Sequence, residues 1–365
     1  MRRAAAAVLV ALALVAACGD DGDGDDPEPA DAGSAGPEQA EAEAEAARAA
    51  YTGAGPYEVG LTTVLLADRS VEVLYPATEG ATAPPGAPAA PALVGEQVVT
   101  REAPASDEGP FPVLLYSHGF AGSPLVSATL QAGIASWGFV VAAPDHIERN
   151  TAALGRGDPR IDTARDVQTM QETLTSVVAA GEGDGPLTGA VDGERAGSAG
   201  HSAGGGAALN ALRLPAVSAT VTWAGVDPTD EPLPEEPVLV LGAEADMAIS
   251  GDNQRAVYEG LPGPKRLVLL QGGSGHATFL DLCPGARRAM IASGQPREEV
   301  SGIIALAFDG CDADDLDPVL AWEVIQHFTV AHLRDALGVD DVPVGLGDGV
   351  LDEFPDVPVI YEHSP

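Results

Sequence analysis

The sequence has 365 residues, and 55 acidic against 18 basic side chains give it a formal net charge of −37 at pH 7. A surface this acidic repels nucleic-acid phosphates and anionic lipid headgroups, which argues against nucleic acid as a partner and against electrostatic attachment to a membrane. Residues 51–338 are long enough to form one large α/β domain.

The N-terminus is predicted to be a lipoprotein signal peptide over residues 1–18. Arg2 and Arg3 form a positively charged start, and the apolar run at 4–17 is shorter than the about 20 residues of a membrane-spanning helix. The run ends in small residues before Cys18, which resembles a bacterial lipobox. The resemblance implies an exported chain that lipid on Cys18 anchors to the bacterial cell envelope. The alternative is an ordinary secretory peptide with an incidental cysteine.

An acidic tether is predicted at residues 19–50. Its acidic side chains face a single base, Arg48, and large apolar side chains are almost absent. Such a segment cannot bury enough apolar surface to offset the conformational entropy lost on ordering, so we expect it to be disordered.

The predicted domain starts with two strands, at 57–66 and 70–75, which a turn at 67–69 joins. The second strand alternates apolar and polar side chains, as a strand with one buried face does. Residues 78–110 are rich in Ala, Pro and Gly, and we expect them to form an exposed insertion.

Short apolar segments then alternate with helix-like segments. Strands are predicted at 113–116, 139–143, 196–199, 217–223, 238–241 and 267–270, and helices at 125–137, 161–180, 203–212, 253–258 and 318–337. This alternation predicts βα units and therefore an α/β fold, with a mostly parallel sheet that helices cover on both faces. The sequence does not decide whether the tail at 339–365 packs on this domain.

A candidate nucleophile, Ser202, lies in a Gly-x-Ser-x-Gly pattern at residues 200–204. A strand-like run precedes the pattern and a helix-like run follows it, and a sharp strand-to-helix turn of this kind exposes a serine hydroxyl at the edge of a sheet. Because the chain contains 44 glycines, chance alone produces this pattern readily, and the interpretation depends on what surrounds it.

An acid and a base follow the serine in the order that such hydrolases use. The base takes the proton of the serine hydroxyl, and the acid orients the base and stabilises its charge. Asp246 comes after an apolar strand and is the preferred acid, with Glu244 as its rival and Asp227 as a more distant one. His276 lies in a glycine-rich loop after the next strand and is the predicted base.

Three other histidines are given structural roles. His327 and His332 lie five residues apart in the predicted terminal helix, a spacing that does not place two metal ligands on one helix face, so both are predicted to be surface residues. His201 is part of the turn at Ser202 and is expected to pack locally. No metal or cofactor is expected.

Two backbone N–H groups are predicted to stabilise the oxyanion of acyl transfer. One belongs to Ala203, directly after the candidate nucleophile. The other belongs to Phe120, in the glycine-containing loop at 117–122 that follows the first apolar strand.

The chain contains three cysteines. If Cys18 carries lipid, Cys283 and Cys311 remain in a chain that leaves the reducing cytosol, which favours a disulfide between them. The alternative is a pair of buried free thiols.

Several segments resemble the bacterial α/β-hydrolases akin to platelet-activating-factor acetylhydrolases, dienelactone hydrolases and polyester-cleaving cutinases. The segments are Tyr57-Glu58-Val59-Gly60, Asp68-Arg69, Tyr75-Pro76-Ala77, Ser117-His118-Gly119-Phe120, Gly138-Phe139-Val140-Val141, Gly200-His201-Ser202-Ala203-Gly204-Gly205 and His276-Ala277-Thr278-Phe279. The resemblance spans residues 55–335 and implies the α/β-hydrolase fold. It also implies a carboxylic ester hydrolase that needs no cofactor, with Ser202 as nucleophile, Asp246 as acid and His276 as base.

The same resemblance implies that Phe120, Trp223 and Phe279 line the acyl pocket, although Trp223 is equally well interpreted as a core aromatic residue. Two features depart from the family. Dienelactone hydrolases in the strict sense use a cysteine where this chain has a serine, and residues 278–317 are more than a small cutinase needs. This stretch lies between the histidine loop and the terminal helix and is interpreted as a partial lid.

Three functions are compatible with these patterns. The first is an exported serine esterase that acts on a small-molecule ester through an acyl-enzyme. The second is a lipase or phospholipid deacetylase that works on lipid esters of the membrane to which it is anchored. The third is a lipid-anchored binding protein that has lost catalysis, and the complete set of serine, acid and histidine argues against it.

Overall fold

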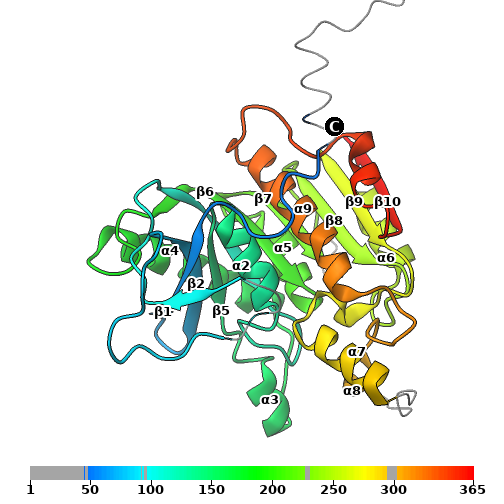
Figure 1. The fold of residues 1–365 in the computed structure, drawn as a ribbon, viewed down its shortest axis with the longest axis horizontal. Helices are drawn as coiled ribbons and strands as arrows, with labels where there is room; N and C mark the ends of the chain where they lie inside the picture. The colour runs from blue at the N-terminus through cyan, green and yellow to red at the C-terminus, as the bar shows by residue number, and fades with distance from the viewer. Residues whose placement is uncertain (1–44, 46–47, 92, 94–96, 227–230, 294–301) are drawn as a thin grey trace, which may run out of the picture.

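The computed structural model describes residue 45 and residues 48–91, 93, 97–226, 231–293 and 302–365 (Figure 1). The predicted signal peptide with Cys18, nearly all of the predicted tether, and Asp227 lie outside these residues. Within the described ranges, no helix is both long enough and apolar enough to cross a membrane.

The described residues build one sheet of ten strands. The strands are β1 (Glu58–Leu65), β2 (Ser70–Ala77), β3 (Val99–Arg101), β4 (Phe111–Ser117), β5 (Val140–Pro144), β6 (Val191–His201), β7 (Val217–Trp223), β8 (Val238–Ala243), β9 (Lys265–Leu270) and β10 (Val359–Ser364). Their order across the sheet is β10-β9-β8-β7-β6-β4-β5-β2-β1-β3. The neighbours from β9 to β5 pair in parallel, whereas β2 is antiparallel to β5 and β10 is antiparallel to β9. The predicted mostly parallel sheet is confirmed.

Helices cover both faces of this sheet. They are α2 (Ala128–Ser136), α3 (Thr151–Arg156), α4 (Thr163–Glu182), α5 (Ala203–Ala211), α6 (Gly251–Gly260), α7 (Leu282–Ser293), α8 (Ile303–Leu306) and α9 (Pro318–Ala336), with 3₁₀ turns η1 (His276–Phe279) and η2 (Asp348–Glu353). On one face, α2 and α9 contribute Leu130 and Phe328 to a core cluster, and Figure 1 shows α9 in front of the sheet. On the other face, α4, α5 and α6 contribute Met170, Leu209 and Tyr258 to a second cluster. The predicted α/β class is therefore confirmed.

The central strands are apolar along their length because both of their faces are covered. Every residue of β4 and of β5 is buried, so neither strand shows the alternation of a half-exposed strand. Parallel strands end at the same edge of a sheet. The loops that follow β4, β6, β8 and β9 therefore meet at one edge, and these loops carry the predicted site residues.

The predicted insertion at 78–110 is in part a component of the sheet. Within it, β3 pairs in parallel with β1, and Val99 and Ala103 are buried. The strand has only three residues and follows a stretch rich in Pro and Ala, so its sequence contains no alternation from which to predict it.

The C-terminal tail packs on the domain. All six residues of β10 pair with β9, from Val359 opposite Leu270 to Ser364 opposite Lys265. The tail also adds Phe354 to the core. It thereby covers a sheet edge whose backbone groups would otherwise be unpaired.

His327 and His332 are buried, so their prediction as surface residues is wrong. The sheet encloses α9 on one side, and the N-terminal segment and the tail enclose it on the other. His327 Nδ1 accepts a hydrogen bond from Tyr51 N at 3.2 Å, and its Nε2 donates to Gly345 O at 2.9 Å. His332 Nδ1 lies 2.9 Å from a guanidinium nitrogen of Arg266. The five-residue spacing of the two histidines argued against a metal site. It did not show which faces of α9 are covered by other segments, and the surface prediction needed that information.

Candidate active site

Ser202 occupies a strained turn between β6 and α5. Its backbone has φ 57° and ψ −122°, a conformation that residues other than glycine rarely adopt. The turn is also tightly packed, because a Cβ atom on Gly204 would lie 1.9 Å from Ser117 O and one on Gly200 would lie 2.2 Å from Gly204 O. The sharp strand-to-helix turn expected from the Gly-x-Ser-x-Gly pattern is present, and the small residues are there because larger ones would collide with backbone.

The structure brings Asp246 and His276 together. Asp246 follows β8, His276 begins η1 after β9, and His276 Nδ1 lies 2.8 Å from Asp246 Oδ2. The other carboxylate oxygen of Asp246 accepts the N–H groups of Ala248 and Ile249 at 2.7 and 2.8 Å. A carboxylate held in this way accepts the Nδ1 proton, which leaves Nε2 of the ring as the free acceptor.

Glu244, the rival acid, does not share this arrangement. Its side chain is exposed, and its carboxylate accepts a hydrogen bond from Gln271 at 3.2 Å. Asp246, in contrast, is almost fully buried beside His276. Among the described candidates, Asp246 is therefore the carboxylate in contact with the histidine.

Ser202 and His276 open onto the same cavity, whose volume is about 190 Å³. Its walls are largely apolar and include Phe120, Leu280 and Leu306. Of the region interpreted as a partial lid, Leu282 and Ala307 also reach this cavity. The predicted disulfide in that region is present, because Cys283 and Cys311 are joined and both are buried.

Two backbone N–H groups, one at the cavity wall and one directly after Ser202, have no hydrogen-bond acceptor in the described part of the chain. One belongs to Ala203, at the first turn of α5, and the other to Phe120, in the loop after β4. Donors left free beside a nucleophile are what an oxyanion needs. The Ala203 donor thus belongs to the first turn of the helix that follows Ser202, and the Phe120 donor belongs to a loop that lines the same cavity as Ser202.

Trp223 and Phe279 are not among the residues that line this cavity. Both are fully buried in the core, and their rings lie 6.3 Å apart. Trp223 Nε1 donates to Thr329 Oγ1 on α9 at 3.1 Å. Their expected role as pocket residues is therefore corrected to core packing, because both are buried in the core and neither lines the cavity.

His201 packs against the base, as expected from its place in the turn. Its Nε2 donates to the carbonyl oxygen of His276 at 2.9 Å, and the two rings are 4.6 Å apart. Burial, followed by the charge of the neighbouring His276, keeps the pKa of His201 well below its ordinary value. His201 is therefore a neutral hydrogen-bond donor that holds the His276 backbone.

A buried polar cluster supports the loop that carries Phe120. Arg149 lies at its centre and donates from Nη2 to Ser117 Oγ at 2.8 Å, from Nε to Asp166 Oδ2 at 3.0 Å, and from Nη1 to the carbonyl oxygen of His118. The backbone carbonyl of Arg149 also accepts the N–H of Ala121 at 2.7 Å. The loop at 118–122 is therefore fixed on both sides by one buried arginine.

The same cluster contains a second set of serine, histidine and aspartate. Ser117 Oγ lies 2.9 Å from His146 Nε2, and His146 Nδ1 lies 2.9 Å from Asp166 Oδ1. Burial lowers the pKa of His146 to about 3. Burial alone would raise the pKa of Asp166, but His146 and Arg149 outweigh it and lower that pKa to about 2. Since all of these side chains are buried, substrate does not reach this set.

Sequence reasoning missed this cluster. The available signal was a polar residue at or just after the end of two apolar strands: Ser117 is the last residue of β4, and His146 lies two residues after the end of β5. The carboxyl ends of neighbouring parallel strands lie side by side, so Ser117 and His146 are expected to lie close together. The pattern did not reveal that Arg149 and Asp166 would join them.

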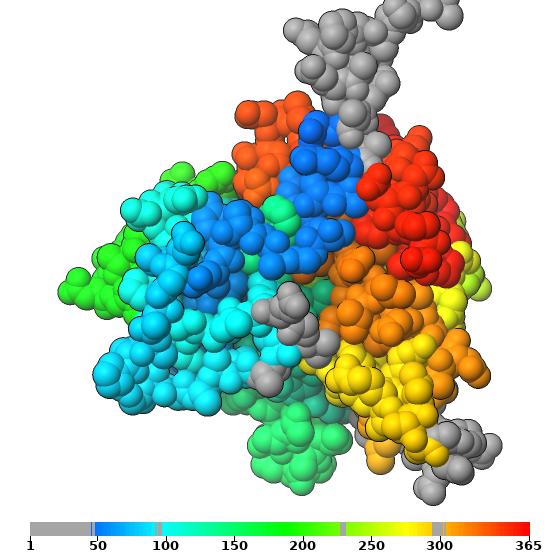
Figure 2. Space-filling model, in the orientation of Figure 1, coloured from blue at the N-terminus to red at the C-terminus, as the bar shows by residue number. Residues whose placement is uncertain are grey.

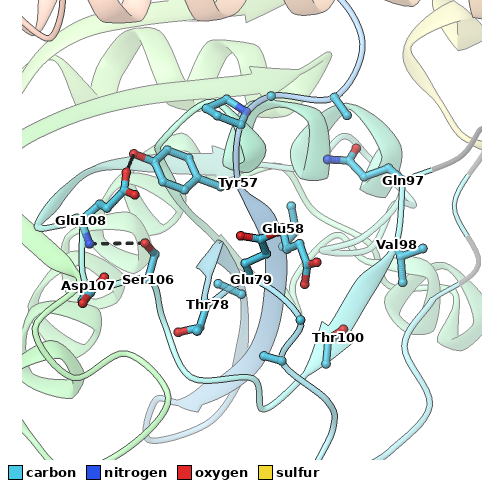
Figure 3. A pocket seen from close by; sticks show the side chains of 17 residues that line it. Tyr57, Glu58, Thr78, Glu79, Gln97, Val98, Thr100, Ser106, Asp107 and Glu108 are labelled. Carbon is cyan, nitrogen blue, oxygen red and sulfur yellow. Dashed lines mark hydrogen bonds between the residues drawn. The ribbon is translucent and has the colours of Figure 1, made fainter.

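A larger cavity of about 870 Å³ lies elsewhere, beside β1, β2 and β3 (Figure 3). Tyr57, Glu58, Glu79 and Glu108 line it, and Tyr57 Oη donates to Glu108 at 2.8 Å. Neither Ser202 nor any histidine is among its lining residues. Its size exceeds that of the Ser202 cavity, but it lacks a nucleophile paired with a base.

One family model matches the chain. It is described as Chlorophyllase and matches residues 94–236, a stretch that includes Phe120 and Ser202 and ends before Asp246 and His276. No curated protein matches the sequence significantly. The matched stretch therefore covers the turn at Ser202 and the loop that carries Phe120, and it does not reach Asp246 or His276.

Proposed function

We propose that this chain, which belongs to the α/β-hydrolase superfamily, is a serine hydrolase that cleaves carboxylic esters through an acyl-enzyme. One observation carries the proposal. Ser202 stands on a strained turn and opens onto the same cavity as His276, whose Nδ1 is bonded to the buried Asp246. The match to an ester-hydrolase family over residues 94–236, which include the turn at Ser202, supports the hydrolase class in general.

The reaction begins when Ser202 Oγ attacks the ester carbonyl carbon while His276 Nε2 takes the hydroxyl proton. Asp246 holds the ring in the tautomer whose Nε2 is free, and it stabilises the imidazolium that forms. The carbonyl oxygen becomes an oxyanion, which the N–H groups of Phe120 and Ala203 bind. As the C–O bond breaks, His276 returns the proton to the departing alcohol. Water then repeats these steps on the acyl-enzyme and releases the acid.

The size of the cavity favours a short acyl group. Its volume of about 190 Å³ is below the roughly 300–1,000 Å³ of pockets that enclose drug-sized ligands. Apolar walls from Phe120, Leu280 and Leu306 suit an alkyl chain. We therefore infer that short-chain esters are the preferred substrates.

A second candidate, hydrolysis at a lipid surface, is favoured by apolar side chains around the cavity. Met247, Leu282 and Ile304 are 65%, 38% and 54% exposed, and each lines the cavity or lies within two residues of one that does. Exposed apolar side chains grouped at an active site are a feature of proteins that bind apolar surfaces. Under this alternative the enzyme is a lipase or a phospholipid deacetylase.

We further propose that the enzyme is exported and anchored by lipid on Cys18. The disulfide between Cys283 and Cys311 suits an oxidising compartment. Figures 1 and 2 show the N-terminal segment and the tail at the side of the molecule opposite to α3 and α7. The tether would join the domain at that side, whereas Leu282 of α7 lines the cavity.

The test uses the chain without residues 1–18 and its S202A variant on p-nitrophenyl esters from acetate to palmitate. Turnover that S202A loses, with a fluorophosphonate label on Ser202 of the parent, is the expected result. The chain-length optimum separates the two candidates, because the small cavity predicts acetate to butyrate and a lipid-surface enzyme prefers long chains in micelles. Absence of turnover and of labelling would instead favour a catalytically silent binding protein.

A further inference from the structure

The loops that carry the acid and the base share one buried carboxylate, that of Asp309. Its Oδ2 accepts the backbone N–H of His276 at 2.8 Å and the backbone N–H of Met247, the residue after Asp246, at 2.9 Å. Asp309 is 7% exposed and contacts the cavity with neither carboxylate oxygen. A single oxygen atom thus joins the two loops through their main chains.

The backbone around Asp309 packs closely against the loop that carries His276. Its carbonyl oxygen accepts the N–H of Ala277 at 2.9 Å. A Cβ atom on Gly275 would lie 2.6 Å from Asp309 Cγ, and one on Gly310 would lie 2.1 Å from Gly275 N. Gly310 also has φ 80°, which favours glycine. Both glycines are therefore required for this close approach.

The segment that carries Asp309 is also covalently fixed. Cys311, two residues further along, is bonded to Cys283, which lies at the start of α7 and a few residues after η1. Both cysteines are fully buried and pack with Ala277 and Leu280. The disulfide therefore ties Asp309 to the segment that its carboxylate binds.

We propose that Asp309 is a positioning residue that sets the place of His276 relative to Asp246. The inference rests on the proposed function. Hydrogen bonds to a carboxylate are stronger than those to a neutral oxygen, so this one oxygen holds both main chains firmly. Misplacement of a catalytic group by 1 Å costs a rate factor of up to about 100. Removal of the Asp309 carboxylate should therefore slow the chemical step and leave substrate binding largely unchanged.

The experiment compares D309A and D309N with D317N, all in the full chain. Asp317 lies in the same segment and caps α9 through Val319 N at 3.0 Å, and asparagine caps helices as well as aspartate does. We expect D309A to lower kcat per titrated Ser202 by at least about 10-fold, with KM changed by less than about 2-fold. D309N keeps an oxygen acceptor but loses its charge, so we expect a kcat between those of D309A and the parent, and D317N should match the parent.

Active-site titration with a fluorophosphonate separates positioning from folding. A merely structural role would reduce the fraction of titratable enzyme and leave kcat per titrated site unchanged, which overturns the proposal. So does a D309N enzyme as slow as D309A, because the hydrogen bonds would then not matter. If D309A does not fold, D309N is compared with D317N instead. A kcat of D309N equal to that of D317N then overturns the proposal. A loss of kcat of about 3-fold or more supports it, because a loss of this order is expected when hydrogen bonds to a charged oxygen are weakened. Failure of the proposed function is distinct, since the parent itself would then neither turn over esters nor be labelled.

Discussion

Arg149 Nε lies 3.0 Å from Asp166 Oδ2, and both side chains are buried beneath the loop that presents Phe120. The pair joins the segment before α3 to α4, so it also joins the oxyanion loop to the body of the domain. A buried ion pair contributes little net stability, but removal of one partner leaves an uncompensated charge. Replacement of either residue should therefore disturb the loop that holds the Phe120 N–H.

The first prediction concerns this pair. R149M should lower the free energy of unfolding by about 3–5 kcal/mol, because Asp166 is left buried without its charged partner. Urea unfolding followed by fluorescence measures the change. R156M is the control, since Arg156 and Asp158 form a largely exposed pair and its loss should have a small effect. Equal effects of the two substitutions would show that the buried pair does not hold the domain together.

The second prediction separates the two candidate acids. D246N should lower kcat by up to about 10,000-fold, because an amide cannot hold His276 in the tautomer that accepts the serine proton. E244Q should behave as the parent, since Glu244 is exposed and bonded to Gln271. Ester hydrolysis under saturating substrate measures both. A greater loss in E244Q than in D246N would transfer the role to Glu244.

The third prediction concerns the second set of serine, histidine and aspartate. A fluorophosphonate should label Ser202 alone, because Ser117 is fully buried and its hydroxyl is bonded to Arg149 and His146. Peptide mapping by mass spectrometry identifies the labelled serine. In S202A the label should be absent altogether. A label on Ser117 in that variant would mean that the buried cluster opens to solvent.

The fourth prediction is a loss of stability at acidic pH. Burial lowers the pKa of His327 to about 4 and that of His332 to about 3. A histidine with a depressed pKa is neutral when folded, so the unfolded chain binds more protons as the pH falls below about 6.5. The folded state therefore has its full stability, as far as these histidines are concerned, above about pH 6.5. It loses stability progressively as the pH falls to about 4 and below. For His327 alone the loss reaches about 3 kcal/mol.

H327Q tests this prediction through the slope of unfolding free energy against pH between 6.5 and 4. The variant should show a shallower slope than the parent, because one of the buried histidines no longer takes up a proton on unfolding. H363Q is the matched control, since the His363 side chain is 42% exposed. Burial raises the pKa of Asp281 to about 6, which opposes the trend in the same range and makes the comparison of variants more informative than the parent curve. An unchanged slope in H327Q would contradict the prediction.

Most of the sheet could be predicted because its strands carry their own signal. The range 217–223 coincides with β7, and the other central strands were found within a few residues, since burial on both faces leaves only apolar side chains. β3 and β10 were missed because edge strands lack this signal. Their assignment depends on partners, β1 for one and β9 for the other, that a local window does not contain.

Part of the candidate site could likewise be predicted from the sequence, and part of it could not. Ser202, Asp246 and His276 were predicted as a set because each follows a strand in a fixed chain order. The structure joins Asp246 to His276 and opens Ser202 and His276 onto one cavity. Trp223 and Phe279 were misplaced because the resemblance does not say how deep in the sheet a side chain lies. The surface positions expected for His327 and His332 were wrong because the periodicity of α9 does not show that a tail and an N-terminal segment cover its outer face.

By itself, the order of residues along the chain determined the α/β architecture and the sharp turn at Ser202, and it singled out His276 as the candidate base. Each of these follows from local chemistry: apolar runs, small residues at a tight turn, and a histidine in a glycine-rich loop that follows a strand after Asp246. The tertiary structure alone brought Asp309 to both His276 and Met247, which are 33 and 62 residues away from it. Contacts across such distances arise from how the loops and the disulfide pack, and no pattern within either segment records them.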